Sequence, residues 1–129
     1  MGAESLAAWI FGVALGALAL FQLGLAMGAP WGRLAMGGRF PGRFPSAMRI
    51  AALVQIVIYA AMGAVVSARA GLALPELLTA SKVAIWGVVG LMAVAVAMNL
   101  LTPSKWERRI WAPVALVMLA TSLVVALMK

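Results

Sequence analysis

The chain has 129 residues, of which 66% are hydrophobic and 10% are charged, and its formal net charge is +7. A soluble domain is about half apolar and about a quarter charged, so this composition excludes a water-soluble globule and indicates an integral membrane protein. The chain has no cysteine and no histidine, which excludes disulfides, thiol catalysis, Cys/His zinc sites and histidine acid–base chemistry.

The first apolar segment is predicted to span the membrane from about residue 5 to residue 27. Roughly 22 residues at about 1.5 Å each cover about 33 Å, the thickness of a hydrocarbon core. The segment has no basic flank before it and is longer than the core of a signal peptide, so we expect a retained span. Two pairs of glycines four residues apart, Gly12 with Gly16 and Gly24 with Gly28, predict a face for helix packing. The same spacing also arises by chance in a segment so rich in alanine and glycine.

Residues 28–45 form a basic loop whose glycines and prolines resist regular structure. The tetrapeptide GRFP at 38–41 repeats at 42–45 and alternates cation with aromatic ring. One interpretation is a clamp for lipid headgroups, in which arginines bind phosphate while Phe40 and Phe44 enter the interface. The other is an ordinary cytoplasmic loop of a membrane protein.

Three further spans are predicted at about 46–70, 75–101 and 104–128. Pro75 suits the first position of a helix, and Ser104 with Glu107 has the spacing of a capping box. Pro113 falls inside the last span, where it should bend the helix. We therefore predict one domain over residues 1–129, an all-α transmembrane four-helix bundle built from two helical hairpins.

The basic residues predict the orientation of these spans. Seven of the ten fall in the loops after the first and third spans, and three fall on the opposite side. The positive-inside rule then places those two loops in the cytoplasm and both termini outside it. We expect the seven to bind anionic lipid headgroups, and we predict no nucleic-acid partner. These residues are Arg33, Arg39, Arg43, Arg49, Lys105, Arg108 and Arg109.

Three amide side chains, Gln22, Gln55 and Asn99, lie well inside the predicted spans, and Tyr59 follows Gln55 by one helical turn. All three amides fall in the half nearest the basic loops, so they can meet between the first three helices. One interpretation is a pocket for a small molecule or lipid headgroup, rimmed by Trp31 and by Arg33 or Arg49. The other is hydrogen bonding between helices, since a buried amide seeks a partner in hydrocarbon.

No carboxylate falls well inside a span, because Glu4, Glu76 and Glu107 all lie at span ends. Neither a general acid–base pair, nor a nucleophile with its base, nor a carboxylate metal site has candidates. We therefore predict a protein that is not an enzyme and that has no cofactor and no metal.

Three segments resemble uncharacterised four-span proteins from the inner membrane of high-GC bacteria: residues 21–32, residues 37–49, and residues 106–114 with the run WERRIWAPV. The resemblance implies a multi-pass protein of the bacterial inner (cytoplasmic) membrane, and it implies no known activity.

Two hypotheses for function remain from the sequence. The first is a non-enzymatic protein that acts by helix–helix association, as a homo-oligomer or as an accessory subunit of a membrane complex, with its basic loops on lipid. The alternative is a passive transporter, channel or small-molecule binder that uses the amide cluster.

Overall fold

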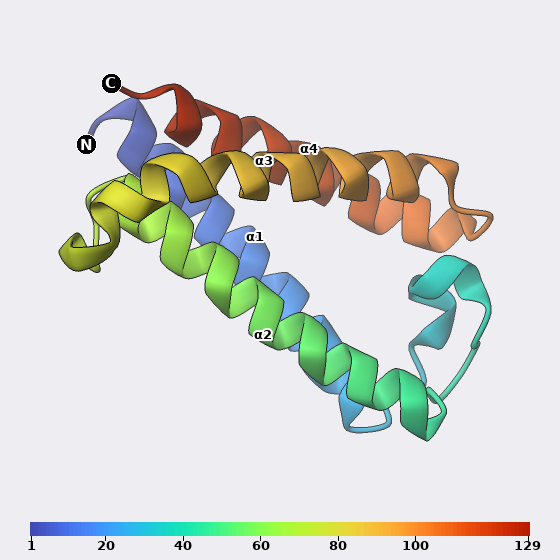
Figure 1. Cartoon of the computed structure of the whole chain (residues 1–129). Coiled ribbons are helices and arrows are strands. Elements are labelled where there is room, and N and C mark those ends of the chain that lie inside the picture. The colour runs from blue at the N-terminus through green and yellow to red at the C-terminus, as the bar shows by residue number, and fades with distance from the viewer.

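The computed structural model describes residues 1–129 as four long helices with short connections (Figure 1). The helices are α1 (Ala3–Ala26), α2 (Ser46–Arg69), α3 (Leu78–Leu101) and α4 (Lys105–Leu127). A 3₁₀ turn, Pro75–Leu77, leads directly into α3, so the third span is Pro75–Leu101. Each span is long and apolar enough to cross a membrane. The all-α, four-span prediction is confirmed, and the chain is a multi-pass membrane protein.

The helix ends fall within two residues of the predicted positions, and local chemistry explains several of them. Gly71, at φ +74°, follows α2 in the left-handed conformation that ends many helices. Pro75 opens the 3₁₀ turn, where its missing N–H costs nothing. Ser104 caps α4, since its Oγ accepts a hydrogen bond from the Glu107 N–H at 3.3 Å. The fourth helix continues through Pro113.

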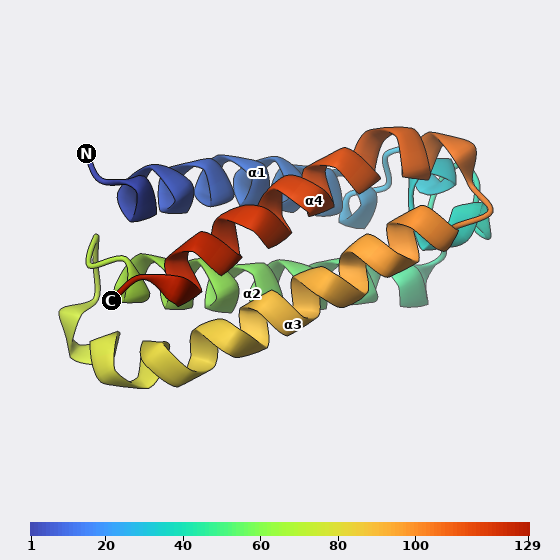
Figure 2. The same cartoon turned by 90° about the horizontal axis from the view of Figure 1, so that it is seen from above.

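The four helices form two antiparallel hairpins, α1–α2 and α3–α4 (Figure 1). The hairpins converge at the end that holds both termini and separate toward the other end. The view from above shows α3 and α4 running across the first hairpin at an angle (Figure 2). We call the first end the termini end. The opposite end is the loop end, where residues 27–45 connect α1 to α2 through the 3₁₀ turns Gly32–Leu34 and Met36–Gly38.

The main core fills the bundle from the termini end to its middle. Phe11 of α1, Ile85 of α3, and Met118 and Val125 of α4 have no exposed surface. A separate, smaller cluster lies under the connecting loop and contains Leu25, Phe44 and Ala52. The core is therefore continuous at one end of the bundle and interrupted at the other.

The outer surface of the helices is apolar. Val13, Leu20, Val57 and Val83 are each more than two-thirds exposed, and many other large apolar side chains are exposed around the bundle. Such a surface is unfavourable in water and suits contact with hydrocarbon.

Candidate functional site

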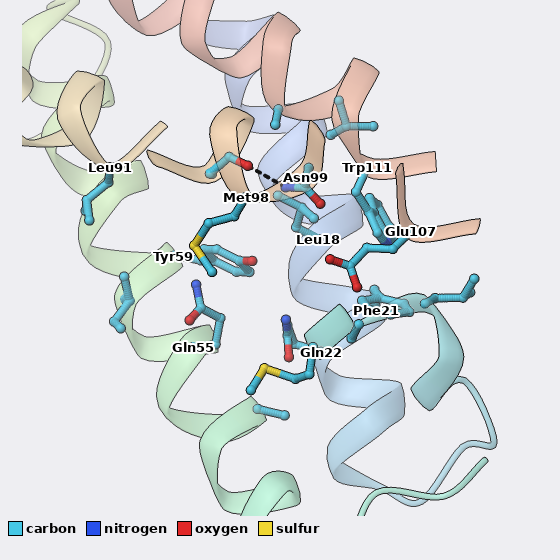
Figure 3. Close-up of a pocket in the computed structure, with 18 of the residues that line it drawn as sticks. Leu18, Phe21, Gln22, Gln55, Tyr59, Leu91, Met98, Asn99, Glu107 and Trp111 are labelled. Atoms are coloured by element: carbon cyan, nitrogen blue, oxygen red, sulfur yellow. Dashed lines mark hydrogen bonds between the residues drawn. The ribbon is translucent and has the colours of Figure 1, made fainter. Parts of the chain in front are cut away.

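A cavity of about 380 Å³ lies between the hairpins on the loop-end side of the main core (Figure 3). All four helices contribute to its wall, and Leu34, Ala35, Met36 and Phe44 of the connecting loop close it at the loop end. Of its 25 lining residues, 21 are hydrophobic, so the few polar groups in it stand out against an apolar wall.

Three of the polar groups come together from two helices. Gln22 of α1 and Gln55 of α2 point toward Tyr59, one turn along α2 (Figure 3). Both amides lie within reach of the Tyr59 hydroxyl, so the three side chains form one polar cluster in the cavity wall. The two amides have more donors and acceptors than one hydroxyl can pair, so some of them remain available to a molecule in the cavity.

Asn99 lines the same cavity from α3. Its Nδ2 donates a hydrogen bond to the Ala95 carbonyl oxygen of its own helix at 2.8 Å. This bond satisfies part of the amide locally, and Oδ1 remains free for the cavity. The structure thus brings all four residues of the predicted cluster to one cavity.

The predicted basic rim is wrong, because neither Trp31, Arg33 nor Arg49 lines the cavity. Trp31 instead stacks on Phe21, with ring centroids 6.1 Å apart. Arg49 Nε donates to the Ala26 carbonyl oxygen at 2.8 Å. The guanidinium of Arg33 lies over a tryptophan ring of α4 outside the cavity. The two arginines and Trp31 contact carbonyl groups and rings of the protein itself, so neither guanidinium group lines the cavity.

Glu107 lines the cavity, although the sequence placed it only at a span end. In a full capping box, its carboxylate would accept the Ser104 N–H. Here Thr102 Oγ1 accepts the Ser104 N–H at 3.2 Å, so the Glu107 carboxylate is free to bond elsewhere. Its Oε2 accepts instead from the Gly37 N–H of the connecting loop at 3.0 Å. The available signal was Thr102 itself, a second hydroxyl that competes for the same donor.

Trp111 follows Glu107 by one turn of α4 and also lines the cavity. Its ring packs against Phe21 at 4.7 Å between centroids, so α1 and α4 form an aromatic wall beside the carboxylate (Figure 3). The Trp111 Nε1 is buried and has no hydrogen-bond partner. The i, i+4 spacing of these two α4 residues was the signal in the sequence that could have found this wall.

The seven residues predicted to bind headgroups all lie at the loop end, in the connecting loop or in the first turns of α2 and α4. Six of them are exposed, and Arg49 is half-buried. They are therefore arranged along the surface that a headgroup layer would contact, and their role stays a prediction.

The four glycines of α1 have different surroundings. Gly12 and Gly16 face open space, since a Cβ added at either position would meet no side chain within 4 Å. Gly24 packs directly under the Trp31 ring, and Gly28, at φ +94°, lies beside the Arg43 guanidinium. Gly24 and Gly28 therefore leave room for loop side chains of the same chain. Packing of Gly12 and Gly16 against another helix stays a prediction.

No protein-family model, no curated protein and no solved structure matches this chain significantly. The resemblance to four-span proteins of high-GC bacteria therefore stays a prediction beyond the four spans themselves.

Proposed function

We propose that this membrane protein binds a small amphipathic molecule in the cavity between its hairpins, and that it does so without chemical transformation. The observation that carries the proposal is the convergence of Gln22, Gln55 and Tyr59 on one space in an otherwise apolar wall. Each amide carries two donors and one acceptor oxygen, more than the Tyr59 hydroxyl can pair, so the polar group of a ligand can bind to the remaining donors and acceptors.

The dimensions of the cavity support this proposal. Small-molecule sites in proteins have volumes of about 300–1,000 Å³ and apolar walls with a few polar groups that fix orientation. This cavity holds about 380 Å³ and has that composition. Its floor contains Met62, Met92 and Met118, whose flexible side chains adapt to ligands of varied shape.

The side between α2 and α3 gives the ligand a route. Ile58 of α2 and Leu91, Val94 and Met98 of α3 line the cavity and are also exposed on the outer surface. That side would face the hydrocarbon of the bilayer. Exchange with the membrane, as by a binding protein or a passive carrier of amphiphiles, therefore fits the chain better than an aqueous pore.

Photolabelling in liposomes tests the proposal. The probe is hexadecanol with a diazirine in its chain, which is uncharged and partitions into lipid. Ala95 lines the cavity, so Ala95→Phe should fill it and reduce labelling of cavity residues about tenfold. Ala93 is an exposed residue of α3 outside the cavity, and Ala93→Phe serves as the matched control. Equal labelling of the cavity peptides in both variants would show that the probe binds only the outer surface.

We further propose that the loop end faces anionic lipid on the cytoplasmic side of a bacterial inner membrane, with both termini outside. The support is the excess of basic residues at the loop end.

Self-association along α1 is a second candidate function, supported by the open space at Gly12 and Gly16 and by a shallow apolar groove beside Gly16. The oligomeric state in mild detergent, measured by native mass spectrometry, separates it from ligand binding, because the cavity needs no second copy.

A further inference from the structure

We infer that the ligand of this cavity is a cationic amphiphile whose ammonium- or guanidinium-type head lies against Glu107. The inference rests on the proposed function, because it names the class of molecule that the same cavity takes. It is carried by the distribution of charge around the cavity, by the partners of the Glu107 carboxylate and by the aromatic wall beside it.

The charges of the chain are unequally divided between the cavity and the rest of the molecule. The chain has ten basic residues and three acidic ones. One of the three acids, Glu107, lines the cavity, and no lysine or arginine does. Glu107 is thus the only charged side chain in the cavity wall. An anionic head would meet this carboxylate without a cation to offset it.

Three arginines near Glu107, two of them next to it in the sequence and one in the connecting loop, have partners of their own. Arg109 lies over the Trp106 ring, 5.8 Å from its centroid, and Arg33 lies over the same ring at the same distance. Arg108 Nη1 reaches the Thr102 carbonyl oxygen at 3.5 Å. All three arginines are exposed, so water and salt screen their effect on a group inside the cavity. The carboxylate has no ionic partner within the chain to displace.

Two local features suit a carboxylate at this position. Glu107 lies in the first turn of α4, where the helix dipole favours negative charge. The Gly37 N–H donates to Oε2, and this bond fixes the side chain against the loop. The carboxylate reaches toward the space bounded by Tyr59, Gln22 and Phe21 (Figure 3). Its remaining acceptor sites are therefore available to a donor in the cavity.

The neighbouring groups suit a cation in the same position. Phe21 and Trp111 flank the carboxylate, and aromatic faces attract ammonium and guanidinium groups. The amide oxygens of Gln22 and Gln55 can accept hydrogen bonds from such a head. The apolar tail would extend along the methionine floor or out between α2 and α3. A carboxylate, aromatic rings and neutral acceptors around one space together select a positive head.

Two photoprobes with identical chains test the inference: hexadecylammonium and hexadecanol, each with the same diazirine. Both are presented in liposomes of zwitterionic phosphatidylcholine, so that lipid charge does not concentrate the cation. Wild-type protein should be labelled in the cavity at about tenfold lower concentration of the ammonium probe than of the alcohol. In Glu107→Gln the two probes should label the cavity at about the same concentration, because the ammonium probe loses its advantage. Glutamine keeps an oxygen that accepts from the Gly37 N–H, so the loop contact survives.

The matched control is Glu76→Gln, which makes the same change of charge at an exposed site before α3, at the termini end. It should keep the full preference for the ammonium probe. A preference that persists in Glu107→Gln, or a loss of both probes in that variant, would overturn the inference. If the alcohol labels the wild-type cavity and the ammonium probe has no advantage, the inference fails while the proposed function stands. If Ala95→Phe changes labelling by neither probe, the proposed function itself fails.

Discussion

The termini end and the loop end of this bundle are packed differently. At the termini end, large apolar side chains such as Phe11, Ile85 and Val125 are fully buried, and the hairpins are joined by the short connection before Pro75. At the loop end the hairpins separate, residues 27–45 fill part of the gap, and a cavity remains (Figure 1). The difference indicates that the continuous core at one end stabilises the bundle, while the cavity at the other end gives room for the proposed ligand.

Hydrogen bonds and a small apolar cluster hold the loop end together. The Gly37 N–H bonds to Glu107, and Ser104 Oγ donates to the Arg33 carbonyl oxygen at 2.7 Å. Within the loop, the Gly32 N–H donates to the Gly42 carbonyl oxygen at 2.9 Å. Bonds of this kind contribute about 0.5–1.5 kcal/mol each, so the loop should open more easily than the core.

The largest expected effect is at the termini end. Phe11→Ala should lower the free energy of unfolding by about 2–3 kcal/mol, because it leaves a cavity in a fully packed core. Burial relative to lipid adds little, since hydrocarbon is as apolar as the core. Unfolding in detergent, followed by circular dichroism, measures the effect. Val13→Ala, at an exposed position of the same helix, should stay near wild type. Equal losses in both variants would contradict a core concentrated at this end.

A smaller and more local effect is expected at the loop end. Gly37 has φ +68°, and alanine in the left-handed region costs about 1–2 kcal/mol. A Cβ there would meet Pro103 only at ordinary contact distance, so the cost is conformational. In Gly37→Ala, hydrogen exchange should rise about tenfold in residues 28–45 and stay unchanged around Phe11. Gly12→Ala, in a helix and facing open space, should leave exchange in the loop unaltered. A global rise in Gly37→Ala would show that the two ends unfold as one unit.

The sequence predicted the helical part of this picture well. Uninterrupted apolar runs, together with Pro75 and the Ser104 cap, placed the ends of the helices within two residues. Helical spacing also placed Gln22, Gln55, Tyr59 and Asn99 at similar depth, and the structure brings them to one cavity. These features depend on short-range periodicity, which a sequence displays directly.

The packing of the connecting loop could not be predicted from short-range periodicity. Whether residues 27–45 fold between the hairpins or away from them depends on contacts with Ser104 and Glu107, about 70 residues along the chain. The capping-box pattern assigned the Glu107 carboxylate to the Ser104 N–H, and Thr102 took that donor instead. The competition is between two hydrogen bonds of similar strength, so the spacing of residues alone does not decide it. The Glu107 carboxylate therefore lies at the cavity, where the only charged side chains predicted from the sequence were basic.

The smallest expected effect on stability is at Gln55, and it separates a binding site from helix packing. Hydrogen bonds between membrane helices contribute about 0.6 kcal/mol on average. Gln55 makes no such bond of standard geometry, so Gln55→Leu should change the free energy of unfolding by less than about 0.5 kcal/mol. The same change should weaken retention of a polar-headed amphiphile, measured by native mass spectrometry. A loss of stability well above that value, with ligand retention intact, would mean that the amide joins helices. The polar side chains at the loop end would then join helices, as the apolar core does at the termini end.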